Sequence, residues 1–267
     1  ACDIFLITNG EGGFKYATLA ESIYGVELTQ EGPGRWYLPS IRRMELLAAC
    51  KVLHVRNVWF MTQRDHRYTQ DPLEVLGADA EVWDIPYLKQ ELAHVLEAGD
   101  YDFVLTFAPS ATTHGHHQAA TVLAVQAVAA LPAQQRPVLL GARVETAEIG
   151  VPTRPESLAD FPETAIVASQ PALVFDRLEK FGHRDALDYR IVVNWAIGMH
   201  RSQGTMQLAM SQGLREHSFL FEANAPGAAE RAVEWFAALA TPQFEAKQYG
   251  SSAGTNAGTE ADAGAQD

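Results

Sequence analysis

The chain is predicted to fold as an α/β protein with a Rossmann-like, mostly parallel sheet that carries helices on both faces. Three observations predict this class. Short, continuous apolar runs recur along the chain and are typical of strands buried on both faces of a parallel sheet. Helical segments separate these runs, as in successive βαβ units. Three of the runs end in polar clusters, which is where ligands collect in open α/β sheets.

The first predicted strand is 4–7, and it ends in the segment Thr8-Asn9-Gly10-Glu11-Gly12-Gly13. Residues 14–39 are mixed in composition, with Gly32-Pro33-Gly34 at their centre, so they are predicted to be rich in turns. Ser40 is a good N-cap residue and is predicted to begin a helix.

The remaining elements follow from the same patterns. They are a strand at 58–61, a helix from about 86 to 97, a strand at 101–107, a helix at 118–131, strands at 138–140 and 165–168, and a helical segment at 189–199. No linker divides residues 1–249, which are predicted to form a single domain. Residues 250–267 consist of small and acidic residues without periodicity and are predicted to be disordered.

Composition excludes several classes of function. The net charge of −13 argues against nucleic acid or an anionic membrane as the main partner. No apolar run approaches the roughly 18 residues that a membrane-spanning helix needs. Cys2 and Cys50 lie in apolar patterns, so both are predicted to be buried thiols, in keeping with a reducing cytoplasm. The oligomeric state is not predicted.

The tetrad His114-Gly115-His116-His117 is the most informative motif. It lies where the strand at 101–107 gives way to the helix at 118–131. Imidazole is the commonest metal ligand in proteins and the usual acid or base near neutral pH. A solvated cluster of histidines, or a metal site without catalysis, remains an alternative interpretation.

Other polar segments are less specific. The glycines of 8–13 let backbone approach a ligand, but their spacing fits neither Gly-rich phosphate loop, and a plain turn explains them equally well. Asp65 follows the strand at 58–61, within Arg64-Asp65-His66. Arg42 and Glu45 are three residues apart and could form a solvated ion pair. If the strands are neighbours in one sheet, the three strand ends would line one crevice.

Taken together, the segments from Ile4 to Gln203 resemble the PIG-L / LmbE-like family of zinc-dependent N-deacetylases. His114-Gly115-His116-His117 is similar to the family's His-x-Asp-His motif. His200-Arg201-Ser202-Gln203 is similar to its late His-x-Ser/Thr-Gln element. Thr8 to Gly13, the helix segment Arg42-Arg43-Met44-Glu45 and Arg64-Asp65 complete the match.

The resemblance implies hydrolysis of the N-acetyl group of an amino sugar such as N-acetylglucosamine, or of its conjugate, with Zn²⁺ or another divalent metal. It implies that His117 is a zinc ligand and that His114 stabilises the oxyanion or protonates the leaving amine. On the substrate side it places Arg42, Asp65, His200, Asn9 and Gly12. Zinc suits this reaction because it polarises a carbonyl and lowers the pKa of bound water to about 7.

The sequence departs from the family at two points. His116 stands where the family has an acidic residue, and a histidine cannot supply the same charge. The family's His-Pro-Asp-Asp motif, which supplies two zinc ligands and the general base, is absent from the sequence. The chain is therefore expected to be an N-terminally truncated form that has no substantial deacetylase activity alone. A truncated form is favoured over a degenerate relative because natural loss of a central strand would leave two strand edges unpaired.

Two other functions stay open. One is a non-catalytic carbohydrate- or small-ligand-binding protein on the same fold. The other is a nucleotide-binding Rossmann protein that uses Gly10, Gly12 and Gly13, which the loop spacing disfavours. Four aromatic residues near the polar segments could stack on a sugar or belong to the core: Trp36, Tyr37, Tyr68 and Trp83.

Overall fold

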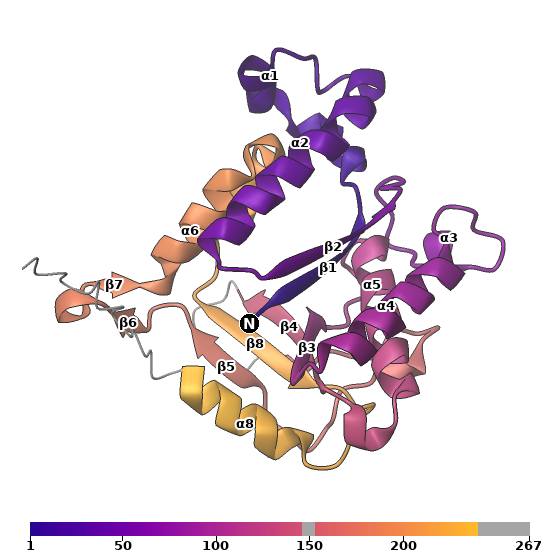
Figure 1. The fold of residues 1–267 in the computed structure, drawn as a ribbon, viewed down its shortest axis with the longest axis vertical. Coiled ribbons are helices and arrows are strands. Elements are labelled where there is room, and N and C mark those ends of the chain that lie inside the picture. The colour runs from indigo at the N-terminus through magenta and orange to yellow at the C-terminus, as the bar shows by residue number, and fades with distance from the viewer. Residues whose placement is uncertain (146–152, 240–267) are drawn as a thin grey trace, which may run out of the picture.

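The computed structural model describes residues 1–145 and 153–239 and shows an α/β fold, as predicted (Figure 1). Strands β1 (Asp3–Thr8) and β2 (Asn57–Gln63) pair in parallel and form one sheet. A second sheet has the order β3-β4-β8-β5. Its strands are β3 (Phe103–Phe107), β4 (Val138–Glu145), β5 (Leu173–Asp176) and β8 (Arg215–Leu220), and a small hairpin joins β6 (Lys180–Phe181) to β7 (Leu187–Asp188).

The second sheet is mixed rather than mostly parallel. Strands β3 and β4 run parallel, whereas β8 runs antiparallel to both β4 and β5. Sequence patterns missed β5 and β8. Strand β8 (Arg-Glu-His-Ser-Phe-Leu) opens with charged residues, which conceals its apolar end. Its last four residues are nevertheless buried, since they lie at the centre of the sheet.

The helices are α1 (Thr18–Tyr24), α2 (Glu31–Val52), α3 (Leu73–Leu76), α4 (Ile85–Gly99), α5 (Gly115–Ala130), α6 (Tyr189–Met199), α7 (Met206–Met210) and α8 (Ala228–Leu239). Short 3-10 turns are η1 (Glu11–Tyr16), η2 (Ala133–Gln135), η3 (Pro162–Thr164), η4 (His183–Asp185) and η5 (Arg201–Gln203). Helix α8 covers one face of the second sheet, α5 packs on β3 and β4 from the other side, and α2 packs against α6 (Figure 1).

The prediction that residues 14–39 are mainly turns was wrong. They contain η1, α1 and the first turns of α2, which begins at Glu31 and not at Ser40. Pro33 is tolerated because it lies in the first turn, where backbone N–H groups have no partner within the helix. Gly34 is buried against the Leu28 carbonyl and the Phe14 side chain, so its role is close packing and not a turn.

Two further expectations are corrected. Residues 165–168 form no strand. They follow η3 and join the sheet by one isolated bridge between Ile166 and Phe221. Cys50 is a buried thiol, but Cys2 is exposed because it precedes β1. The predicted tail at 250–267 lies outside the described residues.

Strands β1 and β3 each have one partner among the described residues, so each leaves one edge open. Helix α5 spans both sheets: Leu123 packs with Met61 of β2, and Val125 packs with Leu139 of β4. Tyr101, two residues before β3, donates a hydrogen bond to Asp3 at the start of β1 over 2.6 Å. The open edges therefore belong to two sheets that share one covering helix.

No helix in residues 1–145 and 153–239 combines the length and apolar character that a membrane span needs.

Candidate functional site

Three side chains meet where β2 ends and α5 begins. Asp65 follows β2, His114 is the N-cap residue of α5, and His116 lies in its first turn. One ligand atom from each lies within 4.8 Å of the others, and His116 Nδ1 is 3.3 Å from Asp65 Oδ1. His116 is buried, whereas the other two are half-buried. Two imidazoles and a carboxylate form a donor set that suits several divalent transition metals.

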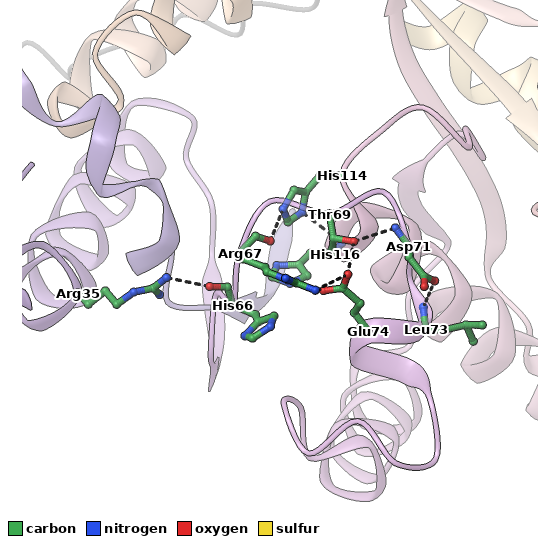
Figure 2. A network of polar contacts seen from close by, with 9 residues as sticks. All are labelled: Arg35, His66, Arg67, Thr69, Asp71, Leu73, Glu74, His114 and His116. Carbon is green, nitrogen blue, oxygen red and sulfur yellow. Dashed lines mark hydrogen bonds and ion pairs between the residues drawn. The ribbon is translucent and has the colours of Figure 1, made fainter. Parts of the chain in front are cut away.

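The loop between β2 and α3 is held by side-chain hydrogen bonds, and one of its backbone carbonyls orients His114 (Figure 2). Glu74 of α3 accepts hydrogen bonds from Arg67 Nε at 2.9 Å and from Thr69 Oγ1 at 2.9 Å. The loop presents the Arg67 carbonyl to His114 Nε2 at 3.0 Å. Because a carbonyl can only accept, Nε2 carries the proton of neutral His114 and Nδ1 carries the lone pair.

The first turn of α5 is anchored to the same loop. The N–H of Gly115 donates to the Thr69 carbonyl at 2.7 Å, and the N–H of His116 donates to His114 Nδ1 at 3.2 Å. A Cβ at position 115 would lie 2.6 Å from the Asp71 carbonyl oxygen. Glycine is therefore required here, and the tight contact fixes the histidines relative to the loop.

Asp65 is positioned by the segment that follows β1. The N–H of Gly12 donates to Asp65 Oδ2 at 3.1 Å, and the N–H of Asp65 donates to Glu11 Oε1 at 3.1 Å. A Cβ at position 12 would lie 2.8 Å from Asp65 Cγ, so only glycine fits against the carboxylate. Asn9 Nδ2 donates to the Thr62 carbonyl at 3.1 Å and ties the same segment to β2.

The electrostatic environment separates the titratable groups. Burial raises the pKa of Asp65, but His116, His114 and Arg42 outweigh this effect and leave the pKa below its ordinary value. Burial, followed by the charge of His116, lowers the pKa of His114. A neutral imidazole beside an ionised carboxylate is the state in which both can bind a cation.

Glu11 is a site residue that sequence reasoning did not single out. Burial raises the pKa of its carboxyl, and its Oε2 is buried without a hydrogen-bond partner among the described residues. A carboxyl with a raised pKa beside Asp65 is a typical feature of functional sites. The only signal in the sequence was its place in the strand-end segment 8–13.

His117 lies apart from this cluster. Its side chain is exposed, and its Nδ1 is 3.2 Å from Thr113 Oγ1. Its ring stacks on Phe107 at a centroid distance of 4.5 Å and lies 5.8 Å from the ring of His114.

Arg42, which is half-buried, and Glu45, which is buried, each bond to Ser202 and do not form a solvated pair. Arg42 donates to the carbonyls of Gly10 and Gly13 and to Ser202 Oγ. Glu45 accepts from the N–H of Ser202 at 2.9 Å and from its Oγ at 2.7 Å. The two residues thereby join the segment after β1 to the turn at 201–203, which sequence spacing alone could not reveal.

His200 caps α6 next to that turn. Burial is the main cause that lowers the pKa of its imidazole. The charge of Glu45 raises this pKa and the charge of Arg42 lowers it. His200 thus lies by Arg42 and Glu45 and outside the Asp65 cluster of ligand atoms.

The aromatic residues divide into two kinds. Trp83 is buried against His116 at 5.2 Å and donates from its indole to the Arg64 carbonyl, so it belongs to the core. Tyr68 is exposed and lies 5.4 Å from the ring of His114. Trp36 and Tyr37 are exposed on α2.

Residues 2–128 match the family model PIG-L, described as GlcNAc-PI de-N-acetylase. The match confirms the resemblance over the part of the chain that carries Gly12, Arg42, Asp65 and the histidine tetrad. A search of curated proteins returned no match.

Proposed function

We propose that the protein is a zinc-dependent hydrolase that removes the N-acetyl group from an amino sugar, N-acetylglucosamine or its conjugate. The observation that carries the proposal is the meeting of Asp65 and His114 at strand ends within the span that matches the de-N-acetylase family. The substrate is a small molecule, and we place the protein in the cytoplasm.

His117 is the zinc ligand in this proposal. The ion, when bound, polarises the acetyl carbonyl and activates a water molecule. His114 is oriented by the Arg67 carbonyl and supplies the proton that the leaving nitrogen needs. Asp65 lies within reach of His114 and favours its protonated form by charge. The segment that faces substrate is shaped by Arg42, Asn9 and Gly12. His200 supports this segment.

The zinc site of this proposal needs the ligands of a His-Pro-Asp-Asp segment, which the sequence does not contain. The open edges of β1 and β3 support a strand between them, because such a strand would pair with both. Leu105 and Phe107 of β3 are 52% and 50% exposed, which is high for apolar residues of a strand predicted to be buried on both faces. We therefore propose that a strand followed by this motif completes the site.

The test is amine release by the protein expressed with the coding sequence upstream of Ala1. We expect an in-frame apolar strand followed by His-Pro-Asp-Asp, and metal-dependent release of free amine from N-acetylglucosamine conjugates. The 267-residue chain is expected to show no substantial turnover. Robust turnover by that chain would contradict the proposed division of the site. Sugar binding without amine release would favour the non-catalytic carbohydrate-binding alternative.

A further inference from the structure

His116 is the residue at which the sequence departs from the family motif, and its surroundings are unusual. Its side chain is only 6% exposed, and its Nε2 has no hydrogen-bond partner among the described residues. Its Nδ1 faces Asp65 Oδ1 at 3.3 Å. A charge-assisted N–H···O bond is about 2.7–2.9 Å long, so this pair is longer than a well-formed ion pair.

The same distance fits two ligands of one metal ion. Ligand atoms about 2.0–2.1 Å from a tetrahedral zinc ion lie about 3.4 Å from each other. Asp65 and His116 have nearly this spacing, and a ligand atom of His114 completes a group within 4.8 Å. Small side-chain movements would therefore bring three ligands to one ion.

Surrounding groups orient two of the three ligands. His114 directs Nε2 to the Arg67 carbonyl, which leaves Nδ1 with the lone pair. Ligating histidines typically donate their other N–H to such a carbonyl. Asp65 directs Oδ2 to the N–H of Gly12, which leaves Oδ1 towards His116. Binding would replace two existing contacts, the bond from the N–H of His116 to His114 Nδ1 and the contact between His116 Nδ1 and Asp65 Oδ1.

We propose that Asp65, His114 and His116 bind one divalent transition-metal ion, of which Zn²⁺ is the simplest example. Three ligands leave a coordination position open to water or substrate. This ion is separate from the zinc assigned to His117. The His117 side chain contacts Thr113 and Phe107 and is not one of the three ligands. While the ion is bound, His114 is a ligand and is not free to donate a proton.

The inferred site uses His114, so its occupancy removes the proton donor of the proposed function. Binding of the ion does not rest on that function, because the three ligands all lie within the described residues. Binding can accordingly be measured without activity, and the two proposals can fail separately.

The experiment is a calorimetric titration of the 267-residue chain with Zn²⁺, with the absorption spectrum of bound Co²⁺ as a second readout. His116→Asn keeps an N–H donor towards Asp65 but removes the imidazole. His117→Gln is the matched control one residue further along α5, and His94→Gln controls for exposed histidines. Circular dichroism and thermal melting establish that each variant is folded.

We expect one ion per chain. Loss of an orienting residue around a metal typically lowers affinity about 10- to 100-fold, so His116→Asn, which removes a ligand, should lower it about 100-fold or more. His117→Gln and His94→Gln should bind as the wild type does. Asp65→Asn repeats the test at the carboxylate if His116→Asn does not fold.

Three results would overturn the inference. They are absence of stoichiometric binding to the wild-type chain, loss of binding in His117→Gln, and unchanged binding in His116→Asn and Asp65→Asn. None of these results measures amine release, so the proposed hydrolase function would be judged by its own assay.

Discussion

Replacement of Glu45 by alanine should remove a buried polar tie between α2 and the turn at 201–203. The Glu45 side chain is buried and accepts three hydrogen bonds, from the N–H and Oγ of Ser202 and from Tyr24 Oη at 3.2 Å. A hydrogen bond to a charged group contributes about 1.5–3 kcal/mol. Tyr24 can bond water instead, whereas buried Ser202 keeps only its contacts with Arg42. We expect Glu45→Ala to lower the free energy of unfolding by about 4 kcal/mol.

Urea denaturation followed by tryptophan fluorescence and circular dichroism measures this loss. Glu31→Ala is the matched control, because Glu31 lies on the same helix but forms an exposed ion pair with Arg35. Such a pair contributes about 0.5 kcal/mol or less. A loss below about 1 kcal/mol for Glu45→Ala, or equal losses in the two variants, would refute the assignment of Glu45 as a buried tie.

Three further predictions follow from other contacts. Asp3 binds Arg56 through both carboxylate oxygens, and the Arg56 hydrogen bond holds the Asp3 pKa below its ordinary value of 3.8. The ion pair of Asp3 with Arg56 therefore stabilises the fold fully above that pKa, and this contribution is lost as the pH falls below about 4. Asp3→Asn should flatten the acid limb of a stability-versus-pH curve, and an unchanged acid limb would count against this. Gly34→Ala should lower the free energy of unfolding by about 1–3 kcal/mol in thermal or urea unfolding, because its Cβ would meet a backbone carbonyl. The control Gly32→Ala, whose Cβ meets nothing within 4 Å, should not destabilise the protein. Equal effects of the two substitutions would contradict the packing argument. Gly12→Ala should displace the Asp65 carboxylate and weaken Zn²⁺ binding about 10- to 100-fold in the calorimetric titration, and wild-type affinity would speak against its positioning role.

The elements that the sequence predicted well are those with an unbroken periodic pattern. Strands β1 and β2 and helices α4 and α5 have apolar runs or repeats that hydrophobic periodicity detects directly. The start of α2 was missed because Gly-Pro-Gly is typical of a turn, although tertiary packing of Gly34 decides its conformation. The antiparallel part of the second sheet was missed because β8 and β5 pair through contacts distant in sequence.

The candidate site was predicted in part. The histidine tetrad and Asp65 were identified as strand-end groups, and the structure brings His114, His116 and Asp65 together. Among the described residues the three strand ends do not belong to one sheet, because β1 and β2 form a sheet apart from β3. Loop hydrogen bonds and shared covering helices bring the ends together instead. The buried tie from Glu45 to Ser202 spans 157 positions, which no local pattern encodes.

The most direct test of the proposed hydrolase is the release of free amine from an N-acetylglucosamine conjugate by the protein that carries the upstream coding sequence, before and after chelation. We predict that exhaustive chelation abolishes amine release, that added Zn²⁺ restores it, and that His114→Gln lowers it at the Zn²⁺ concentration that restores the wild-type protein. Full activity after exhaustive chelation would contradict a metal-dependent deacetylase.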